Sequence, residues 1–444
     1  MNEKKKILIV SYYFAPQNVI GAVRATKLAK YLSRMGHEVT VLCGEGASDM
    51  KDPTLARDLA ELKDVHVVQE WNPIRRCKKR QSETKTESRM QPAGKSKRRG
   101  IASYAVNALY LFLLFCADWS FARRGMREIR RLGKRFDTVI TSYGPLSAHW
   151  IGRGAQKQNM AARWIADFRD VVEMSFPWKN WGAKRYVKQV RDHADCITGV
   201  SAGYLATMGI AEGLAIPNGF DVEDLQGISV NADLEKRTLR FVYCGQMYGA
   251  ERDLSPFFRA MSELVSEGVL GKDQILLEHA GKVQDADIFY AQATAFGLGD
   301  AVKAHGLLPR DEAICLQLSA DAILVAAWNT EACLGNLPGK LLEVLMMDRP
   351  VICCTTGTVP GSESARIIRE TGMGVCYEEA EGEASFLCLK AYVKAMCEAF
   401  AKGEKMPFAP NMNEVEKYAY THVAQAFEKL TVKTPFDEPT QAGL

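Results

Sequence analysis

Short apolar runs separated by segments of helix length recur along the chain. In the first half these runs occupy residues 7–11, 38–43, 65–69, 137–142, 163–167, 195–200 and 213–216. The segment after the first run places Ala25, Leu28, Ala29 and Leu32 at helical spacing. Because strands and helices alternate, the pattern predicts an α/β domain with a parallel sheet.

The same pattern restarts after a polar stretch at residues 231–237. New apolar runs occupy residues 239–245, 275–280, 301–304, 322–326 and 351–354. Two successive sets predict two doubly wound Rossmann-like domains, residues 1–220 and 235–411. Residues 413–430 have helical spacing, and we expect 412–444 to pack back on the first domain. Open sheets bind ligands at the carboxyl ends of their strands, so we expect the ligand in a cleft between the domains.

The stretch GNLPGKLLEVLMMDRPVICC, residues 335–354, reads as loop, helix, turn and strand. Pro338 suits the first helical position. Lys340 and Glu343 then share one face, opposite the leucines. Lys340 lies where the helix start attracts anions, and Glu343 could accept hydrogen bonds from ribose hydroxyls, which together suit a nucleotide. The alternative is an ordinary i,i+3 ion pair on the surface.

Basic charge is concentrated in one part of the chain. The net charge is only +4, too weak to predict nucleic-acid binding, but residues 75–99 carry eleven Lys and Arg against two Glu. The apolar run at 104–117 follows and is too short to span a bilayer. It is either a buried helix or a helix on the membrane surface. In the second case residues 75–117 would meet an anionic membrane.

The cysteines and the N-terminus bear on location. Twelve cysteines are scattered without a CxxC spacing, which argues against structural zinc, and several lie in apolar runs as reduced thiols would. The first apolar run is too short for a signal peptide. We therefore predict a cytoplasmic protein.

Two loops of the first half carry candidate ligand residues. Gly21 opens the first helix, without a GxGxxG fingerprint, and is either a point of close backbone approach or a plain loop glycine. Arg169 and Asp170 follow the run at 163–167 directly, at a strand's carboxyl end. The alternative is an Arg–Asp pair that holds the loop.

Several motifs occur in a characteristic order. They are Gly21 and Arg24 ahead of RMGHEVTVL, SYGPLSAH at 142–149, IADFRD at 165–170, PNGFD at 217–221, YCGQMYGAERD at 243–253 and LPGKLLEVL at 337–345. In this order the chain resembles glycosyltransferases of the GT-B fold, family 4, including enzymes of bacterial capsule and exopolysaccharide synthesis.

The resemblance implies roles for individual residues. Arg252 and Lys340 match the family's basic pair on the donor diphosphate, and Glu343 matches the carboxylate that holds the ribose. The other residues implied for the donor are Gly245, Gln246, His305, Gly306, Gly335, Asn336, Leu337 and Gly339. The residues implied for the acceptor side are Gly21, Arg24, His149, Asp167, Arg169 and Asp170, with base or relay roles for Asp167, Asp170 or His149 as the conventional alternative.

The sequence departs from the family at one donor position. Many members have a second glutamate eight positions before the one that binds ribose, and here that position is Gly335. Asn336, Asn329 or Glu331 takes that role, or the sugar is held in another way.

The resemblance implies a retaining hexosyltransferase that needs neither a metal nor a cofactor. Its donor would be a UDP- or GDP-linked sugar, and its acceptor a saccharide, most simply one linked to lipid on the inner face of the membrane. Two other classes remain open. One is a nucleotide-sugar epimerase of similar architecture, although the seven histidines are dispersed. The other is a non-catalytic scaffold in polysaccharide assembly.

Overall fold

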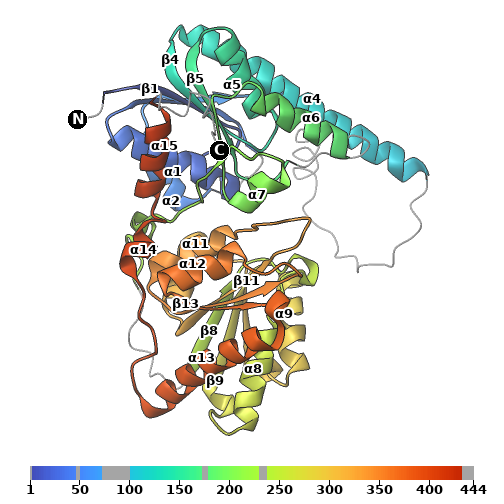
Figure 1. Cartoon of the computed structure of the whole chain (residues 1–444), viewed down its shortest axis with the longest axis vertical. Helices are drawn as coiled ribbons and strands as arrows, with labels where there is room; N and C mark the ends of the chain where they lie inside the picture. Colours follow the sequence, from blue (N-terminus) through green and yellow to red (C-terminus); the bar gives the residue numbers. More distant parts are fainter. Residues whose placement is uncertain (1–2, 47–50, 73–100, 173–178, 230–237, 433–444) are drawn as a thin grey trace, which may run out of the picture. The chain divides into compact units, whose positions relative to one another are not determined.

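The computed structural model describes residues 3–46, 51–72, 101–172, 179–229 and 238–432, and the side chains of helix α4 from residue 108 on. The chain forms two compact units. The first comprises Met1–Gly199, Glu212–Leu214 and Phe427–Leu444, and the second comprises Val200–Ala211 and Ala215–Ala426. Each unit contains its own sheet flanked by helices (Figure 1).

The sheet of the first unit has the strand order β3-β2-β1-β4-β5-β6-β7. Its strands are β1 (Lys6–Ser11), β2 (Glu38–Gly44), β3 (Val65–Val68), β4 (Phe136–Ser142), β5 (Ala161–Phe168), β6 (Cys196–Gly199) and β7 (Leu214–Ala215). Strand β1 lies in the middle and pairs in parallel with β2 and β4, Ile7 lying opposite Val39 and Thr138. Every expected run of the first half is a strand, although β7 has only two residues.

Helices of the first unit cover the faces of this sheet (Figure 1). They are α1 (Ile20–Arg34), α2 (Pro53–Ala60), α4 (Ile101–Leu132), α5 (Ser147–Lys157) and α6 (Lys179–Arg191). Helix α1 buries Ala25, Leu28, Ala29 and Leu32, the stripe expected from the sequence.

Helix α4 is more than twice as long as the apolar run that predicts it. It spans 32 residues, Ile101–Leu132. Beyond the run, Phe121, Ala122, Met126 and Ile129 are buried at helical spacing, while arginines between them are exposed. The helix continues because this second stripe packs on the first unit. No helix among the described residues is both long and apolar enough to cross a membrane.

The second unit has a sheet with the strand order β10-β9-β8-β11-β12-β13. Its strands are β8 (Leu239–Cys244), β9 (Ile275–Ala280), β10 (Val302–Gly306), β11 (Ala322–Trp328), β12 (Val351–Thr356) and β13 (Gly374–Glu378). Its helices are α7 (Ala202–Thr207), α8 (Ser255–Ser266), α9 (Val283–Ala295), α10 (Arg310–Leu318), α11 (Gly339–Val344), α12 (Glu363–Thr371), α13 (Gly382–Lys402) and α14 (Met412–Glu416). All pairings in this sheet are parallel.

Two apolar cores lie on the two faces of this sheet, because successive strand residues point to opposite sides. Phe241 and Leu324 pack with α8, α9 and α13 on one face. Val242 and Val325 pack with α10, α11 and α12 on the other. Strands β1 to β6 of the first sheet and all strands of the second pair in parallel, and both sheets are covered on both faces, so the predicted α/β class with two doubly wound domains is confirmed.

The boundaries between the units differ from the expected ones. The backbone of Phe220 donates to the carbonyl of Tyr418 (3.0 Å) and accepts from the N–H of Tyr420 (2.8 Å). Because of this pairing, residues 215–229 and 412–426 both lie in the second unit, and the chain returns to the first unit only at Phe427. The same pairing interrupts the helix expected at 413–430, which is instead α14 and α15 (Tyr420–Leu430).

Candidate functional site

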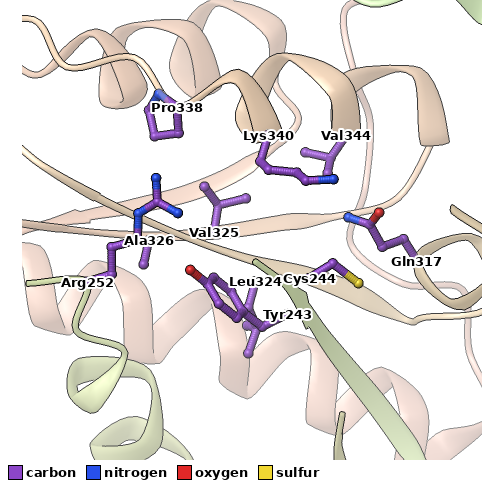
Figure 2. Close-up of a pocket in the computed structure, with 10 residues that line it drawn as sticks. All are labelled: Tyr243, Cys244, Arg252, Gln317, Leu324, Val325, Ala326, Pro338, Lys340 and Val344. Atoms are coloured by element: carbon purple, nitrogen blue, oxygen red, sulfur yellow. The ribbon is translucent and has the colours of Figure 1, made fainter. Parts of the chain in front are cut away.

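A pocket in the second unit brings together the two cations predicted to bind a diphosphate. It is lined by Tyr243, Cys244, Arg252, Gln317, Leu324, Val325, Ala326, Pro338, Lys340 and Val344. Tyr243 and Cys244 end strand β8, Arg252 lies in the loop that follows, and Lys340 lies in α11. In Figure 2 the guanidinium of Arg252 and the hydroxyl of Tyr243 lie on one side of the pocket, whereas Lys340 extends from α11 with its ammonium toward Gln317 on the other side.

Arg252 is a half-buried cation held without a carboxylate. Its Nη1 donates to the carbonyl of Gln246 (3.1 Å), which also accepts from the Tyr243 hydroxyl (2.8 Å). Its Nε is buried and has no hydrogen-bond partner among the described residues. No described carboxylate forms an ion pair with it, so its positive charge remains available to an anion.

Two aromatic rings fix the guanidinium of Arg252. Its Cζ lies 4.6 Å from the ring centre of Tyr248 and 5.4 Å from that of Trp328. The two rings meet edge to face at 5.6 Å. Cation–π contacts hold the charge in place without neutralising it. The order of motifs does not reveal Trp328, because it lies at the end of β11, far along the sequence from Arg252.

Lys340 and Glu343 form the i,i+3 ion pair considered as the alternative, with 2.7 Å between Nζ and Oε2. Glu343 also lies 2.9 Å from Nη2 of Arg310, a residue that sequence reasoning missed. Helix α11 starts at Gly339, one residue later than expected, and has only six residues. In this structure Glu343 is therefore held between two cations, one of which, Lys340, lines the pocket.

The loop before α11 explains why Gly335 replaces an acidic residue. Gly335 has φ +68, and a Cβ at this position would lie 2.7 Å from the Cα of Gly203 and 2.8 Å from Oγ of Ser201. Any side chain there would be strained and would clash with backbone. The Ser201 hydroxyl donates to the Gly335 carbonyl (2.6 Å).

The three candidates for the missing acid differ in availability. Asn329 is buried, and its side-chain amide is already hydrogen-bonded: it accepts from the N–H of Gly335 (3.2 Å) and donates to the carbonyl of Val359 (2.9 Å). Asn336 is also buried, whereas Glu331 is exposed. Leu337 belongs to an apolar core of the unit.

The remaining donor residues lie at the ends of β8 and β10. The Gly245 N–H donates to the Ala280 carbonyl (3.0 Å), and Gly306 has φ +72. His305 contacts Oε1 of Glu278 (2.9 Å), a carboxylate that also accepts from Arg240. His305 and Gly306 are not in the pocket lining. Their predicted place beside the base stays a prediction.

Two of the residues predicted for the acceptor side, Arg24 and Asp167, are buried in the protein core, which argues against direct contact with an acceptor. Arg24 donates from Nε and Nη2 to the two oxygens of Asp167, both at 2.8 Å, and Thr198 donates to the same carboxylate. Arg24 is 2% exposed and Asp167 is 0% exposed. A bidentate pair at this depth is structural, and Asp167 cannot reach a substrate proton in this structure.

His149 is likewise buried, which argues against a proton relay. Its Nδ1 lies 2.7 Å from the hydroxyl of Thr141, and its ring packs edge-on against Phe168 and parallel to Tyr186. Burial lowers the pKa of His149 to about 3, against a smaller opposing effect of Asp167. The imidazole is therefore neutral near pH 7.

The guanidinium of Arg169 occupies the space beside Gly21. The guanidinium of Arg169 donates to the carbonyls of Tyr143 (2.6 Å) and Gly144 (3.2 Å). A Cβ on Gly21 would lie 1.8 Å from Nη1 of Arg169. Asp170 is 4.0 Å from Arg169 and is exposed. Of the acceptor-side candidates, only Asp170 is exposed among described residues.

Comparisons with known proteins agree with this architecture. Residues 21–219 match the family model of the glycosyl transferase 4-like domain. No curated protein sequence matches the chain.

Solved structures resemble the chain over nearly its whole length. Sucrose-phosphate synthase from Thermosynechococcus elongatus has a TM-score of 0.58 at 14% identity, covering 96% of this chain and 98% of its own. The pneumococcal O-GlcNAc transferase GtfA, in complex with UDP and GlcNAc, has a TM-score of 0.54 at 10% identity, covering 97% and 99%. A putative UDP-N-acetylglucosamine 2-epimerase from Listeria monocytogenes has a TM-score of 0.50 at 12% identity, covering 96% and 95%. At these identities the likeness shows the fold.

Proposed function

We propose that the protein transfers a sugar from a nucleoside-diphosphate donor to an acceptor hydroxyl, because residues 21–219 match the family model of the glycosyl transferase 4-like domain. The observation that carries this proposal is Arg252, a half-buried cation without a described carboxylate partner, in the same pocket as Lys340. Paired cations in one pocket suit the diphosphate of such a donor.

The proposed chemistry retains the anomeric configuration. The bond between the anomeric carbon and the phosphate oxygen breaks, and the acceptor oxygen bonds to the same face of that carbon. The departing phosphate oxygen takes the acceptor's proton, so no protein base is needed, in keeping with the buried Asp167 and His149. Arg252 and Lys340 stabilise the negative charge that grows on the diphosphate, in the role that a divalent cation would otherwise have.

The donor test is a panel of UDP- and GDP-linked sugars. A donor at 100 times its Kd adds about 2.7 kcal/mol to the free energy of unfolding, so we expect a rise in melting temperature with at least one of them. The double variant R252A/K340A should lose this rise while unfolding at its own ligand-free temperature. Absence of a shift with every donor would favour the scaffold alternative.

The panel also separates transfer from epimerisation. A glycosyltransferase should release nucleoside diphosphate, faster when an acceptor saccharide is added. An epimerase of the same fold should instead convert one intact nucleotide sugar into another without acceptor. The second result would overturn the proposed transfer.

We further propose a lipid-linked saccharide as acceptor, reached from the cytoplasmic face of an anionic membrane. Helix α4 supports this, because six large apolar side chains in its exposed stretch face solvent: Leu109, Tyr110, Phe112, Leu114, Phe115 and Trp119. Exposed arginines continue along the same helix, and Arg123 stacks on Trp119 at 5.2 Å. Aromatic residues followed by cations are typical of helices at bilayer interfaces. The basic residues 75–99 lie outside the described residues.

Membrane binding is tested with vesicles that contain anionic lipid. The triple variant F112S/F115S/W119S should lose about 10-fold or more in vesicle partitioning, because three large apolar side chains no longer enter the interface. Deleting residues 81–97 should also weaken binding, and more at low salt. Donor-induced thermal shifts serve as the control and should stay unchanged. Equal partitioning of the variants and the parent protein would refute the membrane proposal.

A further inference from the structure

Four charged side chains of the second unit form a continuous row that ends in the pocket. Asp224 lies 3.0 Å from Nη2 of Arg310, the same nitrogen lies 2.9 Å from Glu343, and Glu343 lies 2.7 Å from Lys340. Asp224 comes from a short 3-10 helix at Val222–Leu225, Arg310 starts α10, and the other two lie in α11. The row therefore joins three separate elements.

The row runs from the half-exposed Lys340 at the pocket to the buried Asp224 at its other end. The side chain of Lys340 is 38% exposed, those of Glu343 and Arg310 are 13% and 16% exposed, and that of Asp224 is 4% exposed. A buried carboxylate on one side limits the movement of Arg310, whose planar guanidinium has a fixed set of donors. The side chain of Lys340 can move more than that of Arg310, because it is the most exposed of the four and its ammonium has no fixed plane.

Donor binding as proposed above would change this row at one end. The diphosphate draws Lys340 away from Glu343, because phosphate oxygens compete for the same ammonium. Arg310 is not part of the pocket lining, so it can keep its contacts with Asp224 and Glu343. The Glu343 carboxylate then remains held, and its lone pairs released by Lys340 can accept hydroxyl hydrogen bonds.

We infer that Arg310 is a positioning residue that holds Glu343 in place to accept hydrogen bonds from the donor ribose, with Asp224 anchoring Arg310. This inference rests on the proposed function, because it requires a ribose at Glu343. The inference makes recognition of the ribose depend on Arg310 and Asp224 as well, whereas the family resemblance implies a ribose contact for Glu343 alone.

Three probes separate ribose recognition from phosphate recognition. They are a nucleoside diphosphate, its 2′,3′-dideoxy counterpart, and inorganic pyrophosphate, each titrated by calorimetry. The parent protein should bind the ribonucleotide about 10-fold or more tightly than the dideoxy compound, since hydrogen bonds to a charged group are strong. Pyrophosphate reports on Arg252 and Lys340 alone.

In R310A we expect the preference for the ribonucleotide to fall below about 3-fold, with the affinity for pyrophosphate unchanged. R310K keeps a cation but lacks the planar guanidinium whose Nη2 contacts both carboxylates, so its preference should lie between those of R310A and the parent. It also provides a readout if R310A does not fold. The matched control is R366A, which removes an arginine of the same unit paired to Glu363 and Glu370 on the surface. This control should keep the full preference.

The outcomes separate the two proposals. If the parent binds none of the nucleotides, the proposed function fails and the inference with it. If the parent prefers the ribonucleotide and both Arg310 variants keep that preference, the inference alone is wrong. It is also wrong if R310A loses pyrophosphate affinity to the same degree as nucleotide affinity, because Arg310 would then act on the pocket as a whole.

Discussion

Replacing Arg252 by alanine is expected to lower donor turnover by about 100-fold or more. Arg252 holds its charge between the Tyr248 and Trp328 rings, already oriented and without a described carboxylate to neutralise it. Removing a preoriented group that stabilises charge in the transition state typically costs this much in kcat. The measurement is release of nucleoside diphosphate under saturating donor, so that weaker binding does not disguise the effect.

Lys340→Ala should lower turnover by a similar factor, because the same developing charge loses its second cation. This variant also leaves Glu343 with Arg310 and without its i,i+3 partner. The control is K272A, which removes a cation paired with the exposed Asp300 on the surface of the same unit. That variant should keep normal turnover. Near-normal rates in both R252A and K340A would refute the electrostatic mechanism.

Replacing Asp167 by alanine is expected to destabilise the first unit by about 3–5 kcal/mol. The substitution leaves the guanidinium of Arg24 buried without its bidentate carboxylate, and removing one partner of a buried ion pair typically costs this amount. Thr198 also loses its acceptor. Urea unfolding followed in the two units separately is the appropriate measurement, since two units need not unfold together.

The control for Asp167 is an ion pair of the same unit at the surface. Arg34 and Glu61 are bidentate, like Arg24 and Asp167, but their side chains are 38% and 40% exposed. E61A should therefore cost only about 0–1 kcal/mol. If D167A is no more destabilising than E61A, the buried pair is not structural, and a ligand role for Asp167 becomes open again.

All strands except β13 were predicted, because a buried strand needs only local information; β13 is an edge strand whose residues are mostly half-buried. A buried parallel strand must be apolar along its length, so runs such as 7–11 and 322–326 can be recognised as strands from the sequence. The position of Lys340 on a helix that follows a strand and a loop can be predicted from nearby residues in the same way. Two predictions from local pattern were wrong because of contacts with distant residues. Helix α4 is longer than predicted because a second stripe of its residues is buried. The predicted C-terminal helix is interrupted because its backbone pairs with Phe220.

Charged residues at strand ends show the limit of this reasoning. Asp167 and Arg169 are close in sequence and both follow the rule for ligand positions in open sheets. Yet Asp167 pairs with Arg24, and Arg169 bonds to backbone carbonyls beside Gly21. Sequence spacing cannot distinguish a ligand from a core ion pair, because the partner of Asp167 lies 143 positions away.

The sequence by itself determined the two α/β domains, the order of their strands along the chain and the candidate residues Arg252, Lys340 and Glu343. These follow from hydrophobic periodicity and from motifs within about twenty residues. Only the tertiary structure decided which charges are neutralised, which are buried, and that Trp328 contacts Arg252 and Arg310 contacts Glu343. The physical reason is that the charge state and mobility of a side chain depend on its neighbours in space. The order of the strands in the sheets brings these neighbours together, and no single stretch of the sequence determines that order.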